Sequence, residues 1–311
     1  MRVLNSNEYK LFEQIVAMSQ YGLLRTMATY LKRHYKNCVV TKEYIYAKGS
    51  IPVALVAHLD TVFEPAKEVY YDTRKNVMWS PTGLGADDRA GIFAIIKIIE
   101  AGYRPYVIFT TDEEKGGFGA DSFANDYLDP PVDLKYIIEL DRRGEKDCVF
   151  YECDNEKFTK YVEQFGFEKA WGSFSDISFI CPSWRVAGVN LSIGYKDEHT
   201  YGETFHIDHF FNTVNKVMKM LDVANEAPFF AFVPSRRYWP LSQSKKYNCH
   251  KCKNSFAEYE LIPVKTKTGS TVFYCPDCVV ANVDWCKRCG EPFESEPNNG
   301  MLCVNCRSEN V

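Results

Sequence analysis

Apolar residues before residue 235 follow two different spacings along the chain. Between residues 7 and 34 they recur at the three- and four-residue intervals of an amphipathic helix. Further on, short apolar runs such as "VALVA" give way to turns with Gly or acidic residues, as strands buried on both faces do. The pattern therefore predicts helices and strands in alternation.

The predicted elements can be placed by residue number. Strands are expected at residues 38–46, 53–57, 69–79, 106–110, 136–140, 147–151 and 186–193. Helices are expected at residues 7–34, 89–101, 117–127, 156–165 and 207–226. Because the two kinds of element alternate, the expected fold class is α/β, with a mostly parallel central sheet and helices on both faces.

The chain changes character at about residue 235. Its 311 residues suffice for about two domains, and the part after "FVPSRRYWPLSQSKK" is rich in cysteine. We expect one domain at residues 1–235 and a small one at residues 236–311. The net charge of −4 gives no general reason to expect nucleic-acid binding. Since we recognise neither a long apolar run nor a signal segment, we expect a cytoplasmic protein that does not enter membranes.

Eight of the twelve cysteines form four Cys-x-x-Cys pairs. The pairs are Cys249/Cys252, Cys275/Cys278, Cys286/Cys289 and Cys303/Cys306. Since four thiolates hold one structural zinc ion, the pairs predict two such ions in a double zinc ribbon. We group the pairs sequentially, and the crossed grouping of a RING-like fold stays open. The other thiols are expected to be buried; they are Cys38, Cys148, Cys153 and Cys181.

The cysteine-rich segment also mixes charged and aromatic residues. Its lysines, with Tyr247, Phe256 and Tyr274, could contact phosphates and stack on bases. Acidic residues are interspersed among them, which weighs against nucleic acid. A protein partner, or a lid over an active-site mouth, therefore fits this segment at least as well.

Side chains that bind metals recur where the apolar runs end. They are His58 with Asp60, Asp87, Glu113 with Glu114, Asp141 and His199. The carboxyl ends of parallel strands meet at one edge of an open sheet, so these side chains are expected to lie together there. One such position would mean little, but the whole series predicts a centre for two cations.

The residue types indicate how two cations would be held. Zinc at a hydrolytic site takes His nitrogen and carboxylate oxygen, and a paired site needs one shared ligand. We predict His58, Asp87 and Asp141 for one cation. We predict Asp87, Glu114 and His199 for the other, so that Asp87 is the bridge. The three carboxylates leave one uncompensated positive charge on two divalent cations, which a bridging hydroxide would cancel.

Two further acidic residues have other predicted roles. Neighbouring side chains at a strand end diverge, so Glu114 can bind a cation while Glu113 faces the water as general base and later as acid. Asp60 stands two positions after His58 and can accept the free imidazole N–H, which would fix the tautomer of the ring.

The order of these motifs resembles that of a known group of enzymes. "HLDTV", "GLGADDRAGI", "DEEKGGFGA", "ELD" and "HTYGE" are similar to successive motifs of the co-catalytic zinc exopeptidases, above all peptidase T and its aminoacylase, carboxypeptidase and aminopeptidase relatives. "SFSDISFI", around Ser175 and Asp176, resembles the segment before the last metal strand. The resemblance implies a di-zinc catalytic domain at residues 1–235 that hydrolyses peptide or N-acyl amide bonds. It also implies the roles given above for each candidate residue.

The chain departs from peptidase T in two ways. Those enzymes carry a lid or dimerisation domain between the fourth and last ligands, whereas His199 follows Asp141 by only 58 positions. This spacing indicates a lid-less branch. In addition, Arg142 and Arg143 follow Asp141 directly and could clamp a substrate carboxylate, with solvated charges as the alternative.

Other readings stay open. His206 competes with His199 as the last ligand, but Glu203 stands four positions after His199, as in the family, and favours His199. A non-catalytic recognition protein could keep a peptidase-like core as a zinc holder, although it would not need Glu113. Glutaminyl cyclisation on the same scaffold is a further alternative.

Overall fold

The computed structural model describes residues 2–235, 246–257, 261–286, 292–295 and 302–308. The chain divides into two compact units, Met1–Tyr238 and Trp239–Val311. The segment between Asp141 and His199 belongs to the first unit and forms no separate domain. Within the described ranges, no helix combines the length and apolar character that crossing a bilayer requires.

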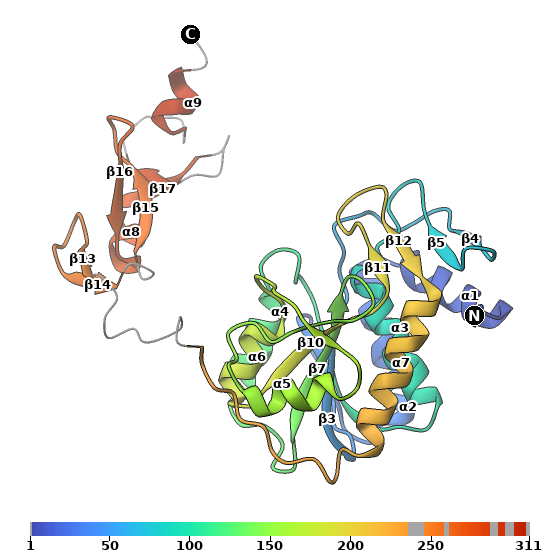
Figure 1. Cartoon of the computed structure of the whole chain (residues 1–311). Helices are drawn as coiled ribbons and strands as arrows, with labels where there is room; N and C mark the ends of the chain where they lie inside the picture. The colour runs from blue at the N-terminus through green and yellow to red at the C-terminus, as the bar shows by residue number, and fades with distance from the viewer. Residues whose placement is uncertain (1, 236–245, 258–260, 287–291, 296–301, 309–311) are drawn as a thin grey trace. The chain divides into compact units, whose positions relative to one another are not determined.

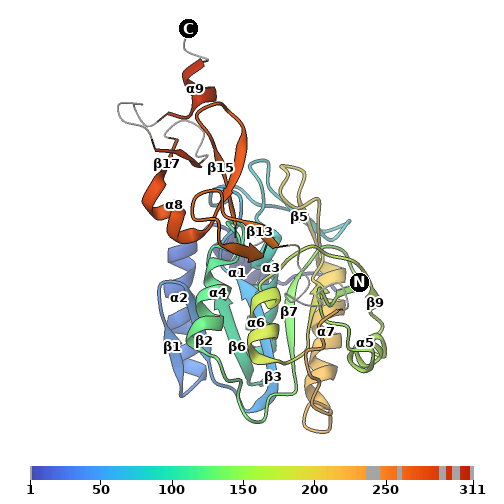
Figure 2. The ribbon, with the colours of Figure 1, turned by 90° about the vertical axis from the view of Figure 1, so that its left-hand side faces the viewer.

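The first unit is built on a mixed sheet with the strand order β1-β2-β6-β3-β7-β10-β8-β9. Its strands are β1 (Cys38–Val40), β2 (Tyr44–Ala47), β3 (Ile51–His58), β6 (Pro105–Thr110), β7 (Tyr136–Arg142), β8 (Asp147–Val149), β9 (Glu168–Lys169) and β10 (Gly188–Ser192). The central strands β6, β3, β7 and β10 run parallel, while β2 and β8 flank them in antiparallel pairs. Figure 2 shows β2, β6, β3 and β7 side by side. The expected α/β class with a mostly parallel central sheet is confirmed.

Helices cover both faces of this sheet. They are α1 (Ser6–Val16), α2 (Gln20–His34), α3 (Ala86–Glu100), α4 (Phe118–Asp126), α5 (Glu156–Glu163), α6 (Ile177–Trp184) and α7 (Ile207–Asp222). Helices α4 and α6 pack on one face, and α2, α3 and α7 pack on the other (Figure 1). Strand β3 supplies both layers, because Val53, Leu55 and Ala57 enter one core and Ala54 and Val56 the other. The central strands are therefore fixed from both sides.

A smaller antiparallel sheet lies against α3 and has the order β11-β12-β5-β4. Its strands are β4 (Tyr70–Asp72), β5 (Val77–Trp79), β11 (Tyr195–Lys196) and β12 (Thr204–His206). The turn between β11 and β12 carries His199, so the pairing of these two strands positions a predicted ligand.

Several helices and strands differ in detail from those expected from the sequence. The helix expected at residues 7–34 is two helices, since Ser19 lies between them and its Oγ accepts the Gly22 N–H at the start of α2 at 3.3 Å. The strands expected at 38–46 and 69–79 are the hairpins β1/β2 and β4/β5. Helix α6 is not predicted by the spacing, because Pro182 inside it is typical of a break. The short strands β9, β11 and β12 are not predicted either.

The second unit has a two-stranded sheet of β13 (Lys246–Asn248) and β14 (Ser255–Ala257), and a four-stranded sheet with the order β16-β15-β18-β17. The remaining elements are β15 (Ile262–Lys265), β16 (Thr271–Tyr274), α8 (Pro276–Asn282), β17 (Val283–Trp285), β18 (Pro292–Glu294) and α9 (Val304–Ser308). The described residues form two small buried clusters, and both include cysteine side chains. These cysteines fit a small zinc-binding domain, in which metal ligation replaces a large apolar core.

Candidate active site

The candidate ligands come from distant segments that meet at one edge of the main sheet. His58 is the last residue of β3, and Asp141 lies near the end of β7. Glu114 lies in the turn after β6, and Asp87 lies at the start of α3. Since β6, β3 and β7 are parallel neighbours, their carboxyl ends bring these residues together, and the β11–β12 turn adds His199.

Asp87 lies between the two candidate histidines. Its Oδ1 is 3.2 Å from His58 Nε2, and its Oδ2 is 3.3 Å from His199 Nε2. His58 Nε2 also lies 3.6 Å from Asp141 Oδ1, and His199 Nε2 lies 3.0 Å from Glu114 Oε1. The five side chains therefore form two groups that share Asp87, which is the arrangement a bridging carboxylate requires.

Asp141 is oriented by its neighbours on both sides. The Tyr195 hydroxyl donates to its Oδ1 at 3.0 Å, and its N–H donates to Asn190 Oδ1 at 2.9 Å. Ser175 Oγ lies 3.3 Å from Asp141 Oδ2 and donates to Glu139 Oε2 at 2.5 Å. The carboxylate therefore has little freedom to turn away from His58.

Asp60 connects His58 to the acidic turn after β6. Its Oδ1 lies 3.2 Å from His58 Nδ1 and accepts the Glu113 N–H at 3.1 Å, while its Oδ2 accepts the Glu114 N–H at 3.1 Å. Glu113 Oε2 lies 4.0 Å from His58 Nε2. Asp60 therefore orients the imidazole and also places the acidic pair, so that Glu114 contacts His199 and Glu113 approaches His58.

The site concentrates negative charge in a buried place. Burial and the neighbouring carboxylates raise the pKa of Glu113 to about 9 and the pKa of Asp141 to about 7. Burial alone would raise the pKa of Asp87, but its hydrogen bonds to His199 and His58 hold it below the ordinary value. The hydrogen bond to Asp87 raises the pKa of His199 to about 9. Positive charge is therefore strongly favoured at this centre.

The donor atoms suit divalent cations of the zinc type. Ligand atoms of Asp87, Glu114 and His199 all lie within 4.8 Å of one another, and so do ligand atoms of His58, Asp88 and Asp141. His nitrogens and carboxylate oxygens are ordinary zinc ligands, and the raised carboxylate pKa values reflect a repulsion that cations would relieve. The residues present therefore fit a pair of cations.

Several polar groups that support the ligands could not be identified from residue spacing in the sequence. They are Asp88, Glu139, Asn190 and Tyr195, all buried. Asp88 accepts the His58 N–H at 3.2 Å and the Gly91 N–H at 3.0 Å. A fully buried glutamate in the apolar run "YIIEL" was an available signal for Glu139. The other contacts depend on strand pairing, which the sequence does not display.

Other candidate residues have protein partners. Arg142 donates to the Trp171 carbonyl at 3.1 Å, and Arg143 pairs with Glu198 at 2.8 Å. Their role in binding substrate stays a prediction. The rival ligand His206 has its Nε2 3.3 Å from Thr204 Oγ1 and stacks on the His209 ring, whereas His199 lies beside Asp87 and Glu114.

A hollow of about 500 Å³ opens beside the candidate centre. Asp60 and Glu114 contribute to its wall, together with Arg89, Phe63 and Tyr21. A space of this size is typical of sites for small molecules or chain ends. Of the five candidate ligands, Glu114 lines this hollow, so a small molecule bound there would lie beside the candidate centre.

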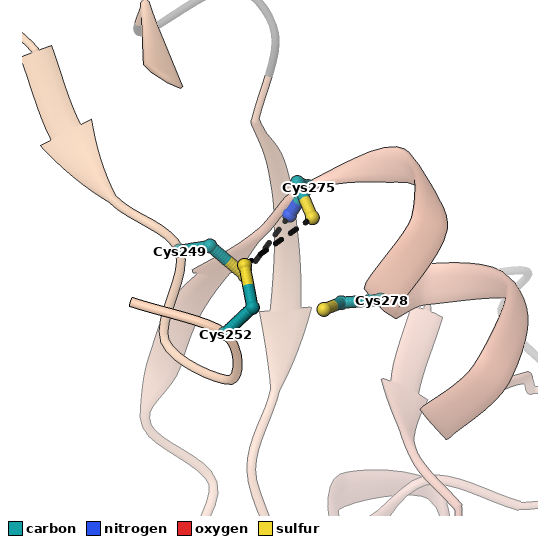
Figure 3. A group of neighbouring side chains, drawn as sticks. All are labelled: Cys249, Cys252, Cys275 and Cys278. Carbon is teal, nitrogen blue, oxygen red and sulfur yellow. Dashed lines mark hydrogen bonds between the residues drawn. The ribbon is translucent and has the colours of Figure 1, made fainter. Parts of the chain in front are cut away.

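The cysteines of the second unit lie in two groups. Cys249, Cys252, Cys275 and Cys278 converge with their sulfurs toward one another (Figure 3). Cys286, Cys303 and Cys306 form the other group, and Cys289 lies outside the described residues. This grouping is sequential. In the first unit Cys148, Cys153 and Cys181 are buried, whereas Cys38, expected to be buried, is partly exposed on strand β1.

Within the first group, Cys249 has the environment of a thiolate, whereas the pKa values of Cys275 and Cys278 are raised. Burial raises the pKa of Cys249, but backbone N–H groups of Cys275, Cys252 and Lys251 outweigh it and lower the pKa to about 6. The Cys275 N–H lies 3.3 Å from the Cys249 sulfur. Because metals bind the thiolate and not the thiol, this backbone arrangement favours ligation.

Comparisons with known proteins show similarity at the level of structure. No protein-family model matches the chain, and no curated protein matches it. Aminopeptidase PepT from Bacillus cereus is similar, with a TM-score of 0.55 and 13% identity over 71% of this chain and 98% of that one. A tripeptidase from Staphylococcus aureus has the same TM-score and identity over 72% of this chain and 100% of its own.

An archaeal relative is also similar. The TET aminopeptidase from a marine-sediment thaumarchaeon has a TM-score of 0.52 and 13% identity over 70% of this chain and 97% of its own. At such low identity the likeness concerns the fold alone. The first unit therefore shares its architecture with structures described as aminopeptidases and a tripeptidase.

Proposed function

We propose that the first unit is a metal-dependent hydrolase of peptide or N-acyl amide bonds, of the exopeptidase or aminopeptidase type. The observation that carries this proposal is the position of Asp87, whose two oxygens face His58 and His199 at 3.2 and 3.3 Å. The fold likeness to aminopeptidase PepT and to a tripeptidase supports it. A pair of zinc ions or other divalent cations fits the ligands present.

The two cations would share Asp87. His58 and Asp141 would complete one site, and Glu114 and His199 would complete the other. Bound there, the cations would polarise the scissile carbonyl and lower the pKa of a water molecule.

Glu113 carries the proton transfers in this proposal. Its Oε2 lies 4.0 Å from His58 Nε2, next to the proposed cations, so it can take a proton from the attacking water and deliver it to the leaving amine. Burial and nearby carboxylates raise its pKa to about 9, which keeps it protonated at neutral pH in the metal-free site. The positive charge of bound cations would lower this pKa and free the carboxylate to accept a proton. Asp60 holds its backbone N–H and the His58 ring in place.

For the second unit we propose two structural zinc ions. One would be held by the cysteines in Figure 3, and the other by Cys286, Cys303 and Cys306 with Cys289. The lowered pKa of Cys249 supports ligation at the first group. Four zinc ions per chain, two in each unit, are then expected.

Substitution of Glu113 by Gln tests the hydrolase. The Glu113→Gln protein should keep its metal content, because this side chain is not a proposed ligand, and should lose turnover by about 10²- to 10⁴-fold. Metal is counted by elemental analysis, and hydrolysis is followed on dipeptides, aminoacyl amides and N-acyl amino acids, with and without chelator. Glu68→Gln is the matched control, since Glu68 is an exposed carboxylate that accepts a hydrogen bond from the Tyr70 hydroxyl at 2.8 Å.

Two outcomes would contradict the proposal. Equal activity in wild type and Glu113→Gln would remove the assigned proton shuttle. A fully metal-loaded wild type without activity on the whole panel would favour a non-catalytic recognition protein, and ammonia release without net hydrolysis would favour glutaminyl cyclisation.

A further inference from the structure

Glu203 reaches across from the loop of one ligand to the backbone of another. It follows His199 by four positions and is only 1% exposed. Its Oε2 accepts the N–H groups of Gly85 and Ala86 at 2.6 and 3.1 Å, and its Oε1 accepts the Asp87 N–H at 3.1 Å. One buried carboxylate therefore binds three consecutive N–H groups that end at the bridging residue.

This contact serves the irregular start of α3, where Asp87 and Asp88 are not helical. The first N–H groups of a helix have no partner within it, and a side chain at the N-cap usually accepts one of them. Asp88 does this for the regular part of α3 by accepting the Gly91 N–H at 3.0 Å, whereas Gly85, at φ 67°, has no side chain for the N–H groups that come before. The acceptor comes instead from a residue more than a hundred positions away, so the start of α3 and the His199 loop are held together.

The loop that carries Glu203 is itself tightly turned. The Glu203 N–H donates to the Thr200 carbonyl at 3.0 Å, and the Thr200 hydroxyl donates to the Asp197 carbonyl at 2.7 Å. His199 lies within this turn at φ 62°, and its side chain is half-exposed. A fixed Glu203 therefore also limits where His199 can lie.

The other side of the centre has its own anchor. Asp88 accepts the His58 N–H at 3.2 Å and the Gly91 N–H at 3.0 Å. Loss of Glu203 would leave these contacts in place, while the Asp87 N–H would lose its acceptor. Substitution of Glu203 should therefore affect the Glu114–His199 side of the centre more than the His58–Asp141 side.

We propose that Glu203 is a positioning residue that sets the direction of Asp87 relative to His199. It thereby determines most strongly the affinity for the cation held by Asp87, Glu114 and His199, because it fixes both Asp87 and the His199 loop. The cation at His58 and Asp141 shares only Asp87 with it and depends on Glu203 less. The inference rests on the proposed pair of cations but not on the proposed hydrolysis.

The test is metal binding by Glu203→Gln. The amide keeps one acceptor oxygen and places an NH₂ group against at least one backbone N–H. Protein that keeps zinc at its cysteines but is stripped of metal in the first unit by mild chelation is titrated with Mn²⁺, and binding and the electron paramagnetic resonance spectrum are recorded. We expect the second equivalent to bind about 10- to 100-fold more weakly, and the first to be weakened less. The signal of a spin-coupled pair in wild type at two equivalents should become that of isolated ions.

Glu8→Gln is the matched control. Glu8 is also a buried carboxylate at a helix start, where it accepts the Asn5 N–H at 3.1 Å, and it lies on α1 rather than beside a proposed ligand. It should lower stability without changing the ratio of the two affinities. Circular dichroism confirms that each variant is folded, and Glu203→Asp serves as a second variant should Glu203→Gln fail to fold.

The outcomes separate this inference from the proposed function. Wild-type affinities and a coupled spectrum in folded Glu203→Gln would overturn the positioning role, as would equal weakening of both equivalents. A wild type that binds only one cation in the first unit would overturn it too. A coupled pair without any hydrolysis would reject the proposed activity and leave the role of Glu203 intact.

Discussion

Replacing Asp60 with asparagine probes how the candidate ligands are held. The carboxylate is 6% exposed and accepts from His58 Nδ1 and from the Glu113 and Glu114 N–H groups, at 3.1 to 3.2 Å. Burial raises its pKa, but the hydrogen bonds from His58 and the two N–H groups outweigh this and lower it, so the group is ionised at neutral pH.

The magnitude follows from the number of acceptors that the Asp60→Asn side chain retains. With its oxygen in the place of Oδ1, the amide would still accept from His58 and Glu113, but its NH₂ group would face the Glu114 N–H. Losing one hydrogen bond to a charged, buried acceptor costs about 1.5 to 3 kcal/mol. The opposite orientation loses two, so the free energy of unfolding of the metal-free protein should fall by at least that amount.

Metal affinity should fall as well. A partner that orients a metal-binding histidine contributes about 10- to 100-fold to affinity, and Asp60 orients His58 and the backbone of Glu114. Urea unfolding followed by circular dichroism measures the stability. Zinc competition against a coloured chelator measures the affinity.

Asp112→Asn is the control for this experiment. Asp112 lies in the same turn but pairs with the Gln20 and Lys115 side chains near the surface, at 3.2 and 2.7 Å. Its loss should cost at most about 1 kcal/mol and leave zinc affinity unchanged. Wild-type stability and affinity in Asp60→Asn would refute the reasoning, because three buried hydrogen bonds cannot then orient the ligands.

Two further predictions concern other parts of the chain. Cys252→Ala should lower the zinc content by one ion per chain in native mass spectrometry, since three thiolates remain in its group, whereas Cys38→Ala on strand β1 should not change the count. Burial raises the pKa of Glu8, but the Asn5 N–H and Lys97 outweigh this and lower it. The stability that Glu8 adds is therefore present at neutral pH and lost as the pH falls through its lowered pKa. The stabilities of wild type and Glu8→Gln in urea should differ at pH 7 and converge in acid.

The pattern of apolar and polar residues predicted an element correctly where its structure does not depend on pairing with other segments. The run "VALVA" is buried on both faces in β3, and the acidic or histidine residue after each central apolar run lies at the same sheet edge. Hairpins were not distinguishable from single strands at residues 38–46, since the turn there has no Gly or Pro. Pro182 concealed α6, because a proline beyond the first helical turn removes a backbone hydrogen bond and is therefore typical of a break.

The supporting contacts could not be predicted in the same way. Tyr195 and Asn190 reach Asp141 through strands that lie more than forty positions further along the chain, and nothing in their own neighbourhoods indicates it. The sequence identified Glu203 by its position four residues after His199. It did not indicate that Glu203 accepts three backbone N–H groups ending at Asp87.

Residue types and their periodicity thus specify the α/β class and the order of the candidate ligands, because burial and strand direction act on each segment alone. The distances between Asp87 and its two histidines, and the turn of Glu203 toward α3, arise from strand register and loop packing. Those depend on contacts between segments far apart in the chain, and a single sequence records each segment but not which others it will touch.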